Sequence, residues 1–250
     1  MRTGSAAVRQ CTAMPGCVGP ATPGRPVVRL YSYPASPNTR RIAIYLREKG
    51  IEPPWEEIVV DLTQGEQMTA DFLRMNPAGK VPVLETDDGI HITQSLPIVE
   101  YLEELYPEPA MIGSSPSERA RVRSLERFVD MEIMGTMGIM AQQRMPLYVD
   151  RFGDSEAVIA YARRRQLLAL QQLEQMVAGN TFVAGDRPTI ADCTLFAIYE
   201  FAFLVDSELT PEFPGLYQWH QRFSMRPSVQ YRAVESDGMD RLKASEHPTQ

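Results

Sequence analysis

The sequence predicts a small α/β domain followed by an all-α domain. Between residues 27 and 106, short apolar strands alternate with amphipathic helical stretches. A run of turn-forming residues, PEPAMIGSSPSE (107–118), is typical of a linker. Beyond it the chain has the apolar periodicity of helices. The expected order in the first domain is β-α-β-α-β-β-α, which gives a mixed sheet with helices packed on it.

Each element of the first domain has a local signal. Apolar and β-branched residues at 27–32 predict a strand, and the helix that follows it ends at Gly50. The turn Asp87-Asp88-Gly89 joins two short strands into a hairpin. The other expected elements are a strand at 55–62, a short helix at 70–75, the hairpin strands at 81–86 and 90–93, and a helix that starts at Ser95.

Composition divides the chain into five segments. The N-terminal extension contains arginines and no acidic residue, as a transit peptide does, but its Pro and Gly content disfavours an amphipathic helix. We therefore expect it to be disordered. The expected segments are a disordered extension (1–26), an α/β domain (27–107), a linker (108–118), an all-helical domain (119–235) and a loose tail (236–250). Within the helical domain, helices are expected at 119–144, 155–178, 189–205 and 214–223.

Charge and apolar content exclude several classes of function. The 250 residues carry a net charge of −7, which argues against a nucleic acid partner because phosphate binding needs a basic surface. The longest apolar run, 193–205, is shorter than the roughly 18 residues of a membrane span and contains Glu200. The three cysteines and three histidines have no metal-ligand spacing, so we expect no metal site. This cysteine usage suits the reducing cytoplasm.

Ser36 lies where the first predicted strand turns into the first predicted helix. Pro37 follows it and suits the first helical position. Asn38 and Thr39 could cap a slightly later helix start equally well. The Ser36 hydroxyl could therefore cap the helix or point outward to do chemistry.

Thr189 and Asp192 form a Thr-x-x-Asp arrangement ahead of a very apolar stretch. This spacing is that of a relative of the capping box, in which each side chain bonds the other residue's backbone N–H. We interpret it as a signal for helix initiation and not for catalysis.

Four motifs, taken together, resemble the glutathione transferase family. They are LYSYPASPNTRRIAIYLREKGI (30–51), NPAGKVPVLE (76–85), ITQSLPIVEYLEELYP (92–107) and FVAGDRPTIADCTLFA (182–197). They occur in the family's order, and the resemblance covers residues 27–235. It implies a thioredoxin-like N-terminal domain followed by a C-terminal helical bundle domain.

The resemblance implies roles for residues of the first and third motifs. Ser36 matches the family's catalytic serine or threonine, and Asn38 could support the thiolate as well. Gln94 and Ser95 match the pair that holds the γ-glutamyl end of glutathione, with Ser95 expected as the helix N-cap. A helix N-terminus attracts a carboxylate, which fits this role.

The second motif and the stretch before it are expected to hold the rest of glutathione. The resemblance implies a cis Val81–Pro82 bond, which leaves the Val81 N–H and C=O free to pair with the cysteinyl unit as an added strand. Gln67 and Lys80 align with side chains that reach the glycyl carboxylate in related proteins.

The acceptor substrate has a weaker signal. MEIMGTMGIM (131–140) places four methionines three residues apart. Such a stripe is usually core, but the resemblance puts this helix beside the cleft between the domains, where thioethers suit apolar electrophiles. We therefore expect Met134 and Met137 in the acceptor site. Arg144 and Tyr148 would follow one and two turns further along the helix.

The expected function is a glutathione transferase of the serine type, with glutathione as co-substrate and a small electrophile as acceptor. It would need no metal and form a cytoplasmic homodimer. The Zeta class, which isomerises maleylacetoacetate, has Ser-Ser-Cys where this chain has Ser36-Pro37-Asn38. The Nu class, which reduces disulfides, has the similar Thr-Pro-Asn. Both reactions stay open, as does a non-catalytic binding module on the same fold.

Overall fold

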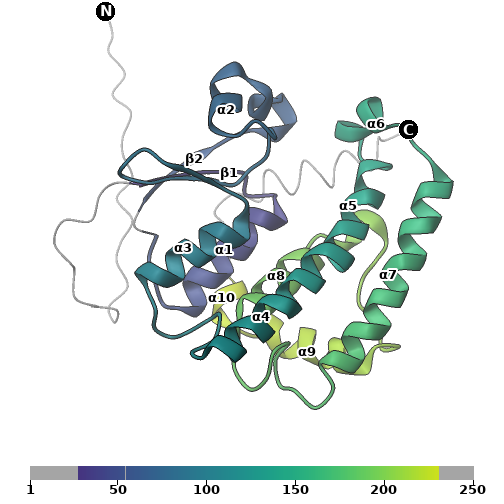
Figure 1. Cartoon of the computed structure of the whole chain (residues 1–250). Helices are drawn as coiled ribbons and strands as arrows, with labels where there is room; N and C mark the ends of the chain where they lie inside the picture. Colours follow the sequence, from purple (N-terminus) through teal and green to yellow (C-terminus); the bar gives the residue numbers. More distant parts are fainter. Residues whose placement is uncertain (1–27, 54, 231–250) are drawn as a thin grey trace, which may run out of the picture.

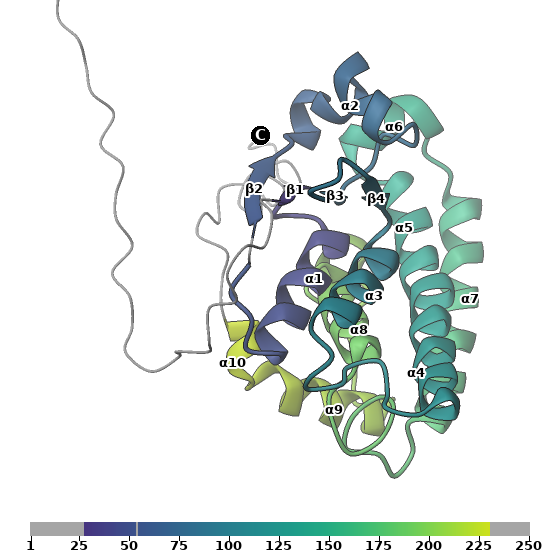
Figure 2. The same cartoon turned by 60° about the vertical axis from the view of Figure 1, so that its left-hand side comes forward.

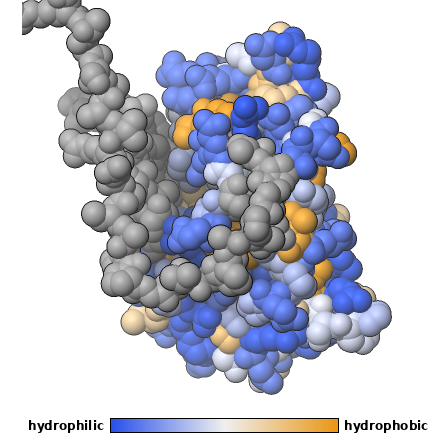
Figure 3. All heavy atoms as spheres, turned by 90° about the vertical axis from the view of Figure 1, so that its left-hand side faces the viewer, coloured by the Kyte–Doolittle hydropathy of each residue, from blue (hydrophilic) through white to orange (hydrophobic). Residues whose placement is uncertain are grey.

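A computed structural model describes residues 28–53 and 55–230 (Figure 1). The predicted N-terminal extension and C-terminal tail lie outside these described residues. Within them, no helix is both long enough and apolar enough to cross a bilayer. Figure 3 views the molecule from a direction 90° away from that of Figure 1. On this face, the described residues are mostly hydrophilic, with separate hydrophobic patches.

A four-stranded mixed sheet forms the centre of the N-terminal domain, as predicted. Its order is β2-β1-β3-β4. β1 (Val28–Ser32) pairs in parallel with β2 (Trp55–Val59) and antiparallel with β3 (Val83–Glu85), which pairs antiparallel with β4 (His91–Thr93). β2 is shorter than predicted because the Asp61 side chain accepts a hydrogen bond from the Thr63 N–H and starts a 3-10 turn.

The two faces of the sheet pack into different cores. Successive side chains of a strand point to opposite faces, so Val83 lies in a small core with Phe72, whereas Leu84 lies in the large core. α2 (Ala70–Met75) covers the first face. α1 (Pro37–Glu48) and α3 (Ser95–Leu105) cover the second, and beyond them lies the helical domain (Figures 1 and 2).

The helical domain is built around α8 (Ile190–Tyr199), all ten residues of which are buried. The capping box predicted for this helix is confirmed: Asp192 accepts hydrogen bonds from the Thr189 N–H and hydroxyl at 2.9 Å each. The other elements are α4 (Pro116–Phe128), the π-helical turn η3 (Val129–Met134), α5 (Gly135–Gln142), α6 (Pro146–Phe152), α7 (Glu156–Met176), the 3-10 turn η4 (Ala202–Val205), α9 (Pro214–Ser224) and α10 (Pro227–Gln230).

The helix predicted at 119–144 differs from the structure in three ways. It begins at Pro116 because the Ser115 hydroxyl caps it, accepting a hydrogen bond from the Glu118 N–H. The π-helical turn interrupts it, and it ends at Gln142. α6 was not predicted, because its N-cap residue is Met145, which gives no capping signal.

Ion pairs join α1 to the helical domain. The Arg41 side chain, only 3% exposed, donates to Glu126 at 3.1 Å and to Asp130 at 2.7 Å. Arg40 pairs with Glu200 at 2.6 Å. Because α1 also packs against α8 in the large core, its N-terminal half is held against α8 and η3.

Candidate active site

A cavity of about 420 Å³ lies between the two domains. The N-terminal end of α1, the 3-10 turn η2 (Glu66–Met68) and the loop at 78–81 line one side. η3, α5, α6 and the segment around η4 line the other. The strand-to-helix turn at Ser36 therefore opens into a space that both domains enclose.

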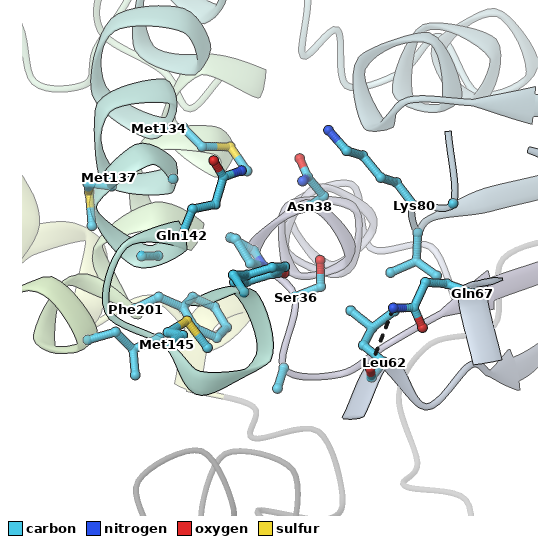
Figure 4. Close-up of a pocket in the computed structure, with 18 of the residues that line it drawn as sticks. Ser36, Asn38, Leu62, Gln67, Lys80, Met134, Met137, Gln142, Met145 and Phe201 are labelled. Carbon is cyan, nitrogen blue, oxygen red and sulfur yellow. Dashed lines mark hydrogen bonds between the residues drawn. The ribbon is translucent and has the colours of Figure 1, made fainter. Parts of the chain in front are cut away.

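Ser36 occupies the N-cap position of α1, and its carbonyl accepts the first helical hydrogen bond from the Arg40 N–H at 2.9 Å. Its side chain makes no capping hydrogen bond. Ser36 is buried and lines the cavity, and Figure 4 shows its hydroxyl pointing into the space between Asn38, Lys80 and Gln67. The hydroxyl is therefore directed at a ligand position and not at the helix.

The alternative caps, Asn38 and Thr39, are also engaged elsewhere. The Thr39 hydroxyl accepts a hydrogen bond from the Tyr33 N–H at 3.4 Å, which fixes the turn before the helix. The Ser95 hydroxyl donates to the Asn38 Oδ1 at 3.3 Å and links α1 to α3. Asn38 also lines the cavity, and its amide nitrogen is not used in this bond.

Ser95 is not the N-cap of α3, and this expectation was wrong. Gln94 is the N-cap, because its carbonyl accepts the hydrogen bond from the Ile98 N–H at 3.3 Å. Gln94 has a positive φ of 69°, which is rare outside glycine and costs of order 1–3 kcal/mol. Ser95 is buried and Gln94 is exposed; neither lines the cavity, and Ser95 is linked to it through Asn38.

The Val81–Pro82 bond is cis, as predicted. Val81 is buried and lines the cavity, and among the described residues its backbone N–H and C=O have no partner. The loop before it is held by Asn76, whose amide donates to the Lys80 carbonyl at 2.6 Å. A short backbone edge is thus open to an extended peptide.

Gln67 and Lys80 line the same side of the cavity. The Gln67 amide donates to the Leu62 carbonyl at 3.5 Å (Figure 4), and its Oε1 is buried without a partner. Such an orphaned acceptor is costly unless a ligand or water donates to it. Lys80 is exposed and forms no ion pair within the described part of the chain.

The methionine stripe divides between cavity, core and surface. Met134 and Met137 line the cavity as expected, whereas Met140 is buried in the core and Met131 is exposed. A spacing of three residues drifts around an α-helix, which has 3.6 residues per turn, so the ends of the stripe face different ways. The Met134 sulfur also accepts a hydrogen bond from Arg41 at 2.7 Å.

Arg144 does not line the cavity, and its expected place was wrong. The helix ends before it, and its guanidinium pairs with Asp206 at 2.6 Å. Tyr148 does line the cavity, but from α6 and not from the end of the preceding helix. Sequence reasoning missed further lining residues: Met68, Gln142, Met145, Arg151, Phe152 and Phe201.

The charge of the cavity is positive. Lys80 and Arg151 line it, and no acidic residue is among the described residues that do. Burial raises the pKa of Tyr148, so its hydroxyl stays protonated at neutral pH. Among the described residues, no group of His, Cys, Asp and Glu side chains could hold a metal ion.

Comparisons with known proteins agree with this architecture. Residues 30–110 match the profile of the glutathione S-transferase N-terminal domain, and residues 136–227 match that of the C-terminal domain. Glutathione S-transferase 2 of Saccharomyces cerevisiae is 29% identical over 203 residues, which are 80% of this chain and 87% of the relative. Maleylacetoacetate isomerase of Pseudomonas aeruginosa is 31% identical over 186 residues, 72% of this chain and 85% of the relative.

A solved structure agrees as well. A glutathione S-transferase domain-containing protein from Marinobacter aquaeolei aligns with a TM-score of 0.75 at 32% identity, covering 80% of this chain and 99% of that one. The fold class is therefore that of a thioredoxin-like domain followed by a helical domain, as the sequence predicted. The chain belongs to the glutathione S-transferase family, and it is an enzyme, a glutathione transferase. This sets aside the alternative of a non-catalytic binding module.

Proposed function

We propose that the Ser36 hydroxyl activates the thiol of glutathione by donating a hydrogen bond to its sulfur. The observation that carries this proposal is that the hydroxyl lines the cavity and makes no capping bond, although Ser36 is the N-cap residue. A sulfur bound there would also lie at the N-terminus of a twelve-residue helix, whose dipole favours negative charge.

These two effects are large enough for the task. A free thiol has a pKa near 8.5, so only a few per cent is thiolate at pH 7. Lowering that pKa by about two units needs roughly 2.7 kcal/mol. A hydrogen bond to a charged group contributes roughly 1.5–3 kcal/mol, and a helix terminus adds roughly 0.3–1 kcal/mol. Asn38 is a second donor at the same place.

The rest of glutathione would lie along the N-terminal domain. Its cysteinyl unit pairs with the open Val81 backbone edge beside Pro82, as an added strand does. The γ-glutamyl end lies towards Gln94 and Ser95 at the start of α3, where free N–H groups attract a carboxylate. Lys80, which lines the cavity, would pair with the glycyl carboxylate, and the Gln67 Oε1, which has no partner, would accept a hydrogen bond from the glycyl N–H.

In the reaction, the thiolate sulfur attacks an electrophilic carbon of the acceptor and forms a carbon–sulfur bond. In a substitution, the electron pair of the bond to the leaving group departs with that group. In an addition to an activated alkene, the electron pair of the π bond takes up a proton instead. Met134 and Met137 supply an adaptable apolar wall for such an acceptor. No residue becomes covalently attached, and no metal is required.

Two other reactions are candidates. The relative from Pseudomonas aeruginosa named maleylacetoacetate isomerase favours isomerisation, in which glutathione adds to a double bond and leaves again. The Ser36-Pro37-Asn38 sequence, with Asn38 lining the cavity, favours disulfide reduction by thiolate attack on sulfur.

One experiment separates these reactions: initial rates with glutathione and an aryl halide, a mixed disulfide or maleylacetoacetate. We expect turnover of the aryl halide. Turnover of the disulfide or of maleylacetoacetate alone would replace conjugation by that reaction. If none of the three reacts and calorimetry detects no glutathione binding, the proposal fails. We also propose that the enzyme is a homodimer of the cytoplasm.

A further inference from the structure

One side of the short helix α6 faces the cavity. Tyr148, Arg151 and Phe152 line the cavity from this helix, at the spacing i, i+3, i+4 that places side chains on one face. The cavity wall that α6 completes lies across from Ser36 and Val81, which line it from the N-terminal domain. Figures 1 and 2 both show α6 and α2 at the same end of the molecule.

The Arg151 guanidinium has no acidic partner in the part of the chain that the structure describes. Within the described residues it forms no ion pair, although Asp150 and Asp154 are close to it in sequence. The guanidinium instead lies over the Phe152 ring, whose centroid is 5.3 Å from the guanidinium carbon. Arg144, the neighbouring arginine in the chain, is instead paired with Asp206. Among the described residues of the helical domain, Arg151 is therefore the cation that lines the cavity without an ion-pair partner.

The groups beside Arg151 suit an aromatic or otherwise apolar ligand that carries one negative charge. The Tyr148 and Phe152 rings lie 6.3 Å apart, centroid to centroid, and give an apolar surface with a hydroxyl donor. Met137 and Phe201 extend that apolar surface deeper into the cavity. A guanidinium matches the two oxygens of a carboxylate with two parallel N–H donors.

We propose that Arg151 is a specificity-determining residue that selects acceptor electrophiles bearing a carboxylate over neutral electrophiles of the same shape. This rests on the proposed function, because the anion is recognised on the acceptor while glutathione occupies the opposite wall. Lys80, on that opposite wall, is left to the glycyl carboxylate. The acceptor's charged group lies at the α6 side of the cavity mouth, and its apolar reactive part points inward to the sulfur.

The test compares two aryl chlorides that differ in charge, 4-chloro-3-nitrobenzoate and 4-chloro-3-nitrobenzamide. The Arg151→Gln substitution removes the positive charge but keeps an extended polar side chain. We expect it to lower kcat/KM for the acid about tenfold, since a charge-assisted hydrogen bond is lost. The value for the amide should stay within about twofold of the wild-type value. Arg164→Gln, which changes an exposed arginine of α7, is the matched control and should change neither.

Equal losses for both chlorides, or no loss for either, would overturn the assignment. Calorimetry with the unreactive pair 3-nitrobenzoate and 3-nitrobenzamide tests it without turnover: Arg151→Gln should weaken binding of the acid alone. If the wild-type protein turns over neither chloride with glutathione, conjugation of aryl halides is contradicted, and the calorimetry still decides the role of Arg151.

Discussion

At the scale of single residues, Ser36 separates the two roles that a serine has at a helix start. Its backbone caps α1, while its hydroxyl faces the cavity. We expect Ser36→Ala to lower the free energy of unfolding by less than the roughly 1 kcal/mol that loss of a helix cap costs. The thiolate absorbance of the glutathione complex should titrate one to two pH units higher, roughly a ten- to hundredfold loss of thiolate at pH values below its pKa.

Asn38→Ala tests the alternative in which the Asn38 amide is the donor that activates the thiol. Thermal melts of both variants show whether the fold is intact, and ultraviolet titration of each complex reports the thiolate. Full turnover in Ser36→Ala together with lost turnover in Asn38→Ala would transfer the catalytic role to the amide.

A second residue-scale prediction concerns Ser95. Ser95→Ala should raise KM for glutathione more than it lowers kcat, because a contact to the γ-glutamyl end is the same in the ground state and the transition state. Since Gln94 is the N-cap, the loss of stability should stay below the roughly 1 kcal/mol of a cap mutation. Steady-state kinetics and a thermal melt check both statements. An unchanged glutathione affinity in an intact fold would remove Ser95 from the site.

At the scale of elements, the capping box of α8 combines initiation of a helix with burial of a carboxylate. Asp192 also accepts hydrogen bonds from the Val183 N–H and from Trp219 Nε1, at 2.8 Å each. Burial nevertheless raises the pKa of Asp192 to about 6, because those hydrogen bonds offset only part of the desolvation. One side chain therefore ties the start of α8 to the preceding loop and to α9.

This raised pKa predicts a pH dependence of stability. The folded state holds its proton more tightly than the unfolded state, in which an aspartate has a pKa of about 3.9. The contribution of Asp192 to the free energy of unfolding is thus fully present below about pH 4. It declines by roughly 2–3 kcal/mol as the pH rises through about 6. Urea unfolding of the wild type and Asp192→Asn at pH 5 and pH 7 measures it. A stability difference between the two proteins that is equal at both pH values would contradict this prediction.

Elements with strong local signals could be predicted from the sequence. Turn residues and apolar periodicity predicted the order of strands and helices along the N-terminal domain and the short helix α2. The Thr-x-x-Asp spacing predicted the capping box, and the family resemblance predicted the cis bond. α6 could not be predicted, since a helix that starts after Met145 at a proline has neither a capping side chain nor two turns of apolar spacing. Missing α6 also placed Arg144 in the site and left Arg151 out.

The positions of Ser36, Val81 and Lys80 in the cavity could be predicted because each lies in a motif through which the chain resembles the glutathione transferase family. The cavity itself, however, forms only because the two domains pack against each other. The Arg41 ion pairs and the shared core depend on residues far apart in the chain, and no local pattern reports them.

At the scale of the whole molecule, exposed apolar side chains mark a surface for the proposed homodimer. Leu168 and Tyr161 of α7 are 59% and 51% exposed, and Met131 of η3 is 58% exposed. Arg165, which lies between the first two on α7, pairs with Glu132 beside Met131, so the three lie on adjoining elements. Large exposed apolar side chains that cluster in this way are typical of protein interfaces.

Leu168→Glu is therefore expected to convert the protein from two chains to one in light scattering after gel filtration, because a buried, unpaired charge opposes association. Met225→Glu changes another exposed apolar residue, outside α7, and should leave the assembly intact. A wild-type protein with the mass of a single chain would contradict the homodimer.

α6 has a consequence for how this enzyme can evolve. None of its side chains that the structure describes belongs to either hydrophobic core. In contrast, α1, which follows the turn proposed to activate the sulfur, is packed into the large core and joined to the helical domain by ion pairs. Substitutions at Tyr148, Arg151 or Phe152 can therefore accumulate with little penalty in folding. Proteins descending from this one are therefore expected to differ in acceptor substrate through changes in α6, while the N-terminal domain and its proposed thiol-activating turn change little.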